Sequence, residues 1–250
     1  MTGLRLPAKF LVLGLLYVIA VAAVGYSAYL HLSRVVDSSE HELTGIEQVR
    51  GTTKTMQLLQ SHRGLSAVLF GDTSMRSAFA NNEVALKSSF ASTAQGIVAG
   101  SNLHAEWQRI HADWERLHKE GGDWAASDNF FAHNRLLDKL QTMKRHIADE
   151  STLLMDPDID AHYLLEASIQ TLPLALETIG QIRGLGAGIL AKKKISGDQQ
   201  LQMRVLLSDL SRTRSALSAN LADTVRYNPG VGQTLEHTEV GVIDVGQGVR

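Results

Sequence analysis

Residues Phe10 to Ser33 read FLVLGLLYVIAVAAVGYSAYLHLS and carry no formal charge. An apolar helix of about 20 residues spans a hydrocarbon core of roughly 30 Å, so this run is long enough to cross a membrane. Arg5 and Lys9 precede the run, whereas Arg34 follows it and is itself followed by three acidic residues: Asp37, Glu40 and Glu42. Because positively charged flanks tend to stay on the cytoplasmic side, we expect the N-terminus in the cytoplasm and the residues after the run outside.

This pattern predicts three regions along the chain. Residues 1–9 form a cytoplasmic N-terminus, residues 10–33 a helix that crosses a bacterial inner membrane, and residues 34–250 an extracytoplasmic, periplasmic domain. A cleaved signal peptide is the alternative, because Ala20-Val-Ala22 resembles a cleavage site. The uncharged run exceeds the roughly 7–15 apolar residues of a signal-peptide core. It also continues without a turn signal into a helical pattern, which favours an anchor that is not cleaved.

The composition favours long helices and argues against several classes of function. Four prolines and 6% aromatic residues suit helices better than a many-stranded sandwich. The net charge is −2 and no basic block occurs, which argues against nucleic-acid binding. The chain has no cysteine for disulfides or thiolate chemistry, and it lacks the common nucleophile-elbow and zinc-protease motifs. We therefore expect no enzymatic activity, no cofactor and no nucleic-acid partner.

Apolar residues recur at helical spacing through most of the chain, beginning with Leu43, Ile46 and Val49. Turn and capping residues interrupt the pattern at Gly71-Asp72, Gly100-Ser101, Gly121-Gly122, Asp156-Pro157 and Ser196-Gly197. The sequence therefore predicts helices at residues 10–70, 75–99, 102–120, 127–155, 157–194 and 197–227. The predicted fold class is all-α: an N-terminal transmembrane helix that continues as a long stalk helix, followed by one extracytoplasmic helical bundle or two stacked bundles.

The helical pattern of the second half is disturbed at Pro173 and after Asn228. Pro173 lies inside a helical pattern, and its ring removes the hydrogen bond to the carbonyl of Ile169, so we expect a kink there. After Asn228-Pro229-Gly230 the pattern weakens, and a further helical seam is suggested only by Leu235, Val242, Val245 and Val249. Since the chain has one membrane segment and a very short cytoplasmic N-terminus, we expect it to be a fragment of a longer protein.

Residues 104–118 contain a seven-residue repeat, in which HAEWQRI is followed by HADWERL and then by His118. The repeat places four large apolar residues on one seam of a helix: Trp107, Ile110, Trp114 and Leu117. The three histidines at positions 104, 111 and 118 stand about 10.5 Å apart along the helix axis, too far for two of them to share one metal ion. We expect buried tryptophans with the histidines as flanking polar positions.

Asp156, Asp158 and Asp160 have the spacing of the first ligands of a calcium loop. The sixth position of such a loop is Ala161 here rather than glycine, and the twelfth is Ala167 rather than glutamate. The stretch fits a helix start better, with Asp156 as the N-cap and a proline in the first turn. We expect no metal site in the chain.

An arginine-glycine motif occurs twice, as Arg63-Gly-Leu-Ser-Ala67 and as Arg183-Gly-Leu-Gly-Ala187. The small residues allow a helix or a ligand to approach closely, while arginine offers five donors in a planar fork. Gly180, Gly184 and Gly188 extend this face, although each glycine inside a helix is unfavourable by about 1 kcal/mol. Two interpretations stay open: a pocket for an anion, or an arginine paired with a core glutamate beside glycines that permit tight packing. The candidate ligand-binding residues are Arg63, Ser66, Arg183, Gly184 and Gly186.

Two stretches resemble known sensor domains. Residues 57–67, QLLQSHRGLSA, resemble the arginine-glycine-leucine-serine helix of nitrate- and nitrite-sensing (NIT) domains. Residues 149–165, which include MDPDIDAHY, resemble the periplasmic sensor region of methyl-accepting chemotaxis proteins, as do the later Leu172-Pro173 and Arg183-Gly-Leu-Gly. The resemblance implies a dimeric helical sensor that feeds a HAMP relay and a cytoplasmic output module. Ser61 and His62 stand where the nitrate-sensing helix tends to carry a second basic residue, which disfavours nitrate as the ligand.

These observations suggest the ligand-sensing region of a bacterial transmembrane signalling receptor of the chemotaxis type. The expected partners are a small anionic ligand, the membrane and a second copy of the chain. One alternative is the same sensor in front of a diguanylate cyclase or a histidine kinase. Another is a membrane-tethered scaffold that binds no ligand.

Overall fold

The structure is a computed structural model, and it describes residues 6–69, 73–155 and 158–237. Every regular element among these residues is a helix and none is a strand, so the all-α prediction is confirmed for the described part of the chain. The chain divides into two compact units, Met1–Leu43 and Thr44–Arg250. All the side-chain contacts discussed below lie within the second unit.

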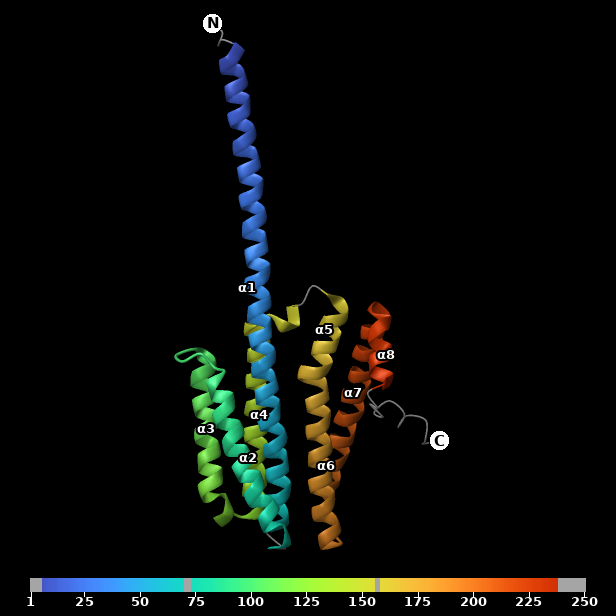
Figure 1. Cartoon of the computed structure of the whole chain (residues 1–250). Helices are drawn as coiled ribbons and strands as arrows, with labels where there is room; N and C mark the ends of the chain where they lie inside the picture. Colours follow the sequence, from blue (N-terminus) through green and yellow to red (C-terminus); the bar gives the residue numbers. More distant parts are fainter. Residues whose placement is uncertain (1–5, 70–72, 156–157, 238–250) are drawn as a thin grey trace. The chain divides into compact units, whose positions relative to one another are not determined.

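Helix α1 extends over Leu6–Leu69 (Figure 1), close to the predicted range of 10–70. Its segment Leu13–Ser33 has a mean hydropathy of 1.9, and none of it is buried. By length and composition this segment is long and apolar enough to cross a membrane. The predicted apolar N-terminal helix is therefore present.

The remaining helices belong to the second unit. Their bounds are Arg76–Gln95 (α2), Asn102–Glu120 (α3), Ala126–Glu150 (α4), Ile159–Glu166 (α5), Leu172–Lys192 (α6), Gly197–Tyr227 (α7) and Pro229–His237 (α8). Short 3-10 turns occur at Thr73–Met75, Gly121–Asp123 and Leu153–Met155. Helices α3 and α7 have the predicted bounds, whereas α2 and α4 end a few residues earlier than predicted. Figure 1 shows α6 and α7 side by side and running in opposite directions.

Side-chain caps define the starts of α3 and α7. Gly100 adopts a left-handed conformation with φ of +81°. Next to it, the Oγ atom of Ser101 accepts a hydrogen bond from the backbone N–H of His104 at 3.1 Å. Before α7, Ser196 and Gln199 form a reciprocal capping box. These interactions are local in sequence, which explains why both helix starts could be predicted.

The predicted helix at 157–194 is interrupted in the structure. Helix α5 passes into a π-helical turn, Ala167–Thr171, and α6 follows with Pro173 in its first turn. Because proline has no N–H, it cannot bond to the carbonyl of Ile169. That carbonyl instead accepts a hydrogen bond from Nε2 of Gln141 on α4, at 3.2 Å. The irregularity expected near Pro173 is therefore a π turn tied to α4.

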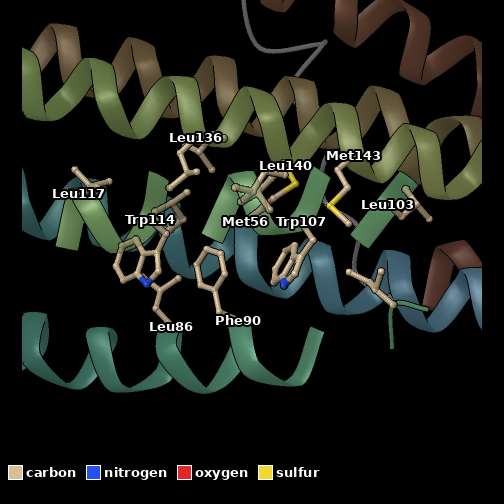
Figure 2. Packing of buried hydrophobic residues seen from close by; sticks show 14 of the residues in the cluster. Met56, Leu86, Phe90, Leu103, Trp107, Trp114, Leu117, Leu136, Leu140 and Met143 are labelled. Atoms are coloured by element: carbon tan, nitrogen blue, oxygen red, sulfur yellow. The ribbon is translucent and has the colours of Figure 1, made fainter. Parts of the chain in front are cut away.

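The second half of α1 packs with α2, α3 and α4 around one apolar cluster. Figure 2 shows Trp107 and Trp114 of α3 close to Phe90 of α2. The rings of Phe90 and Trp114 stack with their centroids 5.5 Å apart. Trp107 is 3% exposed and Trp114 is 2% exposed, so the predicted tryptophan seam is confirmed. The three histidines of the repeat are half-buried or exposed at its edge: His104, His111 and His118.

Some sequence predictions concern residues outside the described ranges. They are the break at Gly71-Asp72, the N-cap at Asp156, and the seam through Val242, Val245 and Val249. Helix α5 itself begins at Ile159 with Asp158 at its N-cap. Helix α8 follows Asn228, where the sequence pattern weakened.

Candidate functional site

The first arginine of the repeat, Arg63, is buried on α1 and pairs with Glu177 on α6. Its Nη1 atom lies 2.5 Å from Oε1 of the carboxylate and its Nη2 atom lies 3.1 Å from Oε2, so the contact is bidentate. Arg63 is 4% exposed and Glu177 is 9% exposed. Charges removed from water in this way are tolerated when they are paired, and loss of one partner leaves the other uncompensated. The pair therefore holds α1 and α6 together.

Three amide side chains complete the hydrogen bonding of this pair. Nη1 of Arg63 also donates to Oδ1 of Asn134 on α4, at 2.6 Å. The carboxylate of Glu177 accepts from Nε2 of Gln60 at 3.1 Å and from Nε2 of Gln181 at 2.9 Å. We name these five residues the Arg63 cluster. It connects three helices, α1, α4 and α6.

The glycines of α6 make room for neighbouring side chains. A Cβ atom at Gly180 would lie 2.7 Å from Nη2 of Arg63, and a Cβ atom at Gly184 would lie 3.1 Å from the ring of Phe130. The same ring lies under the guanidinium of Arg63, with 5.4 Å between Cζ and the ring centroid. A Cβ atom at Gly188 would meet no described atom within 4 Å. The small-residue face thus accommodates Arg63 and Phe130, at Gly180 and Gly184.

These contacts bear on the two interpretations of Arg63 that the sequence left open. An anion pocket at Arg63 requires that its guanidinium is not fully used by a carboxylate of the same chain, and Glu177 pairs with it through both Nη atoms. The reason is tertiary packing, because the two residues are 114 positions apart. Arg63 follows the other interpretation that the sequence left open, an arginine paired with a core glutamate beside glycines.

The second arginine of the repeat, Arg183, has different surroundings. It is exposed on α6 and forms no hydrogen bond or ion pair with the described residues. Its Nη2 atom lies 3.9 Å from the Cβ position of Gly64. The first motif therefore faces the glycine-rich stretch of α6 that contains the second, with Arg63 against Gly180 and Arg183 against Gly64.

The structure separates the remaining candidate residues. Gly184 packs against the ring of Phe130, and the guanidinium of Arg63 lies over the same ring. Gly186 lies toward α7, where its Cβ position is 3.9 Å from Cε of Met203. Ser66 lies on α1 and donates a hydrogen bond to Oδ1 of Asn129 on α4, at 3.0 Å. The five predicted site residues therefore do not form one site.

A buried pair of histidines also joins α1 to α4. Nδ1 of His62 lies 2.8 Å from Nε2 of His133, and both side chains are buried. Burial lowers the pKa of His62 to about 3, with repulsion from His133 and His118 adding to the effect. Burial also lowers the pKa of His133 to about 4. Both imidazoles are therefore neutral at neutral pH.

A cavity of about 600 Å³ lies between α4, the π turn with α6, and α7. We name it the α6–α7 cavity. Arg145 on its wall is exposed and has no hydrogen-bond or ion-pair partner among the described residues, whereas Arg212 pairs with Asp209. Oε1 of Gln141 is buried there without a hydrogen-bond partner in the described chain. Other polar residues of the wall are Glu166, Gln170, Thr171, Thr178 and Thr213. π turns are frequent at functional sites.

Helix α6 links this cavity to the Arg63 cluster. Thr178 lines the cavity, and the preceding residue, Glu177, forms the ion pair with Arg63. Gln181, one turn further along α6, also bonds to Glu177. Glu177, which pairs with Arg63 of α1, and Thr178, which lines the cavity, are therefore neighbours on one helix.

Two ionisable groups of α4 with shifted pKa values, Lys144 and Asp138, were not anticipated from the sequence. Lys144 is fully buried, its Nζ atom has no hydrogen-bond partner among the described residues, and burial lowers its pKa to about 8. Burial also raises the pKa of Asp138, the charge of Glu177 raises it further, and Arg63 opposes both. The burial of Lys144 could have been predicted from its position, because it lies four residues after the apolar Leu140 and so on the same face of the helix.

No model of a protein family, no curated protein and no solved structure matches the chain. The resemblance to sensor domains therefore rests on the quoted motifs alone. Over the residues that it describes, the structure is all-helical and has one helix that is long and apolar enough to cross a membrane.

Proposed function

We propose that the chain is the membrane-anchored, ligand-sensing region of a bacterial transmembrane signalling receptor. The observation that carries this proposal is the buried Arg63–Glu177 pair, which connects α6 to α1. Helix α6 lines the α6–α7 cavity through Thr178, and α1 is the helix that contains the apolar segment Leu13–Ser33. A continuous series of contacts thus leads from a cavity to the helix that we propose enters the membrane.

In this proposal the second unit has two states that differ in the position of α6. A ligand shifts their equilibrium only by the difference between its affinities for the two states. Because both charges of the Arg63–Glu177 pair are buried, separating them is unfavourable. A movement of α6 is therefore more favourable when α1 follows it, and α1 carries the change toward the membrane.

The wall of the α6–α7 cavity favours a small organic acid that also carries a hydroxyl or an amino group. The unpaired guanidinium of Arg145 offers a planar fork for a carboxylate. The unpartnered Oε1 of Gln141 requires a donor, which a ligand hydroxyl or ammonium group would supply. The volume of about 600 Å³ lies within the usual range for small-molecule sites. Hydroxy acids and amino acids meet these requirements.

The resemblance of the quoted motifs to chemotaxis receptors supports a receptor of that type. The proposal then places the second unit in the periplasm, α1 across the inner membrane, and the chain in a homodimer. An enzymatic output, such as a diguanylate cyclase or a histidine kinase, is compatible with the same sensor.

The test is a thermal-shift screen of the full chain in detergent against inorganic anions, hydroxy acids and amino acids. A ligand at 100 times its Kd stabilises a protein by about 2.7 kcal/mol, which corresponds to a shift of several degrees. Arg145→Gln should weaken binding of the best ligand by roughly ten- to a hundredfold, because a charge-assisted hydrogen bond is lost. Arg109→Gln is the matched control, since Arg109 is exposed on α3 and does not line the cavity.

A further variant separates the cavity from the Arg63 cluster. Arg63→Lys keeps the charge but loses the bidentate contact to Glu177, so the melting temperature should fall while ligand affinity is retained. If Arg63→Lys instead weakens binding as much as Arg145→Gln, the ligand lies at Arg63. If no compound of any class stabilises the chain, the scaffold alternative is favoured over a sensor.

A further inference from the structure

A second cavity, of about 190 Å³, lies among α1, α2, α3 and α4. We name it the histidine pocket. Its polar lining comprises His62, Ser66, Glu83, His118 and Asn129, and Phe79 supplies an aromatic wall. At roughly 30 Å³ per water molecule, the volume corresponds to about six waters, which is room for a small molecule. None of these residues lines the α6–α7 cavity.

The hydrogen bonds determine where the histidine protons lie. Nδ1 of His133 is 2.8 Å from the backbone carbonyl of Asn129, and because a carbonyl only accepts, this nitrogen carries the proton. His133 is neutral, so its Nε2 atom carries a lone pair and accepts a hydrogen bond from Nδ1 of His62. His62 is also neutral, and its single proton is used in that bond. The Nε2 atom of His62 is therefore an unprotonated acceptor.

This acceptor is buried and has no donor. His62 is 3% exposed, and its Nε2 atom has no hydrogen-bond partner among the described residues. The nearest charged group is Glu83, whose Oε1 atom lies 3.7 Å away; this is too long for a hydrogen bond, and both atoms are acceptors. The same Oε1 atom accepts from Nδ1 of His118 at 2.9 Å. Glu83 and His118 are partly exposed, so they form the solvent side of the pocket.

We propose that the histidine pocket binds a small primary ammonium ion between His62 and Glu83. The N–H donors of one ammonium group satisfy the lone pair of His62 and the carboxylate of Glu83 together, and its charge offsets that of Glu83. Ser66 donates to Asn129, so the lone pairs of its Oγ atom are able to accept a further N–H. The ring of Phe79, 4.5 Å from that of His62 between centroids, offers a surface for the cation.

The chemistry of the lining distinguishes this site from other kinds. The polar atoms of His62, Glu83 and Ser66 described above act as acceptors, so they select a donor and not an anion. The described residues contain no group of three histidine, aspartate or glutamate side chains that could hold a metal ion. The proposal goes beyond the organic-acid sensor proposed above. Since it uses other residues, either proposal can fail without the other.

The probe is methylammonium, titrated onto the full chain in detergent at constant ionic strength. Two readouts are followed, the melting temperature and the ¹⁵N resonance of Nε2 of His62, which changes when a lone pair accepts a hydrogen bond. Methylammonium should raise the melting temperature saturably and shift the His62 resonance. Potassium and tetramethylammonium ions carry the same charge but no N–H, so they should do neither.

Two variants and one control test the assignment. His62→Asn keeps a donor for His133 but removes the acceptor that faces the pocket, and Glu83→Gln removes the charge. Each should weaken methylammonium binding by about ten- to a hundredfold. Glu106→Gln is the control, because Glu106 is bonded to His146 at 2.8 Å, as Glu83 is to His118, but lies outside the pocket. It should bind as the parent chain does.

Four results would overturn the proposal. They are an equal response to potassium or tetramethylammonium, unchanged affinity in the His62→Asn chain, binding of Zn²⁺ at His62 without binding of methylammonium, and a His62 resonance that does not move. The last result would mean that the pocket holds only water. The resonance is measured on the parent chain, so it decides the matter even where a variant does not fold.

Discussion

Two glycines of α6 differ in what lies next to them, which provides a matched pair of substitutions. At Gly180 a new Cβ atom would lie 2.7 Å from Nη2 of Arg63, and that guanidinium is held by Glu177. At Gly188 the Cβ position has no described atom within 4 Å, so alanine gains about 1 kcal/mol of helix propensity. We expect Gly188→Ala to raise the free energy of unfolding and Gly180→Ala to lower it, measured by urea denaturation. Equal stabilisation by both would show that Arg63 is not held at α6.

The buried histidine pair makes stability depend on pH. The pKa values of His62 and His133 are about 3 and about 4 in the folded chain, against 6.5 for an ordinary histidine. Between these values the unfolded chain binds more protons, so stability rises with pH in this window. The contribution is fully present above about pH 6.5 and is lost as the pH falls toward 4. The other ionisable groups near the pair are Glu83, His118 and Arg63.

Melting temperatures measured from about pH 7.5 down to about pH 5 should therefore decrease. The decrease should be smaller in His62→Asn, which lacks one of the two titrating groups. Asp138 acts in the opposite direction, because burial raises its pKa. Both the parent chain and the His62→Asn chain contain Asp138, so its effect cancels when their pH profiles are compared. A parent profile no steeper than that of the variant would contradict the neutral buried state of His62.

The repeated motif identified Arg63 as a residue of interest, but it did not identify the partner of Arg63. The repeat singled out Arg63, and Arg63 lies against Gly180, which precedes the second copy of the motif on α6. Its partner Glu177 is 114 positions away, and no local pattern distinguishes it from other acidic residues on helices. The pairing depends on how α6 packs against α1. The same holds for His62 and His133, which are 71 positions apart.

At the scale of helices, the ends that local side chains define were predicted well. Ser101 and the Ser196–Gln199 box cap the starts of α3 and α7 within a few residues of chain. The π turn at Ala167–Thr171 was not predicted, although Pro173 indicated an irregularity. The carbonyl freed by Pro173 is bonded by Gln141 of another helix, so the turn depends on tertiary contacts that a local pattern does not contain.

The tryptophan seam of α3 gives a prediction about helix packing. Trp107→Ala and Trp114→Ala should each lower the free energy of unfolding by about 3–5 kcal/mol, because each removes a large buried side chain. Trp124→Ala is the control and should have a smaller effect, since Trp124 is only partly buried. Chemical denaturation measures all three. Losses below about 1 kcal/mol at both buried positions would contradict the packing of α3.

At the scale of the whole molecule, the first question is whether the apolar segment of α1 crosses a membrane. Reporter fusions placed after residue 40 should behave as periplasmic, because positive charge precedes the apolar segment of α1. N-terminal sequencing of the membrane-bound protein should find the first residues retained. A processed N-terminus near Ala22 or Ala28 would show that the segment is a signal peptide.

The central claim is that a ligand in the α6–α7 cavity moves α1 through the Arg63–Glu177 pair. The chain has no cysteine, so spin labels can be attached at cysteines introduced for Lys54 on α1 and Ala112 on α3, both exposed. The distance between the labels is measured with and without the best organic acid of the screen. We expect this ligand to change the distance in the parent chain, and not in a Glu177→Gln chain that still binds it. An unchanged distance in the parent chain with the ligand bound would contradict the account.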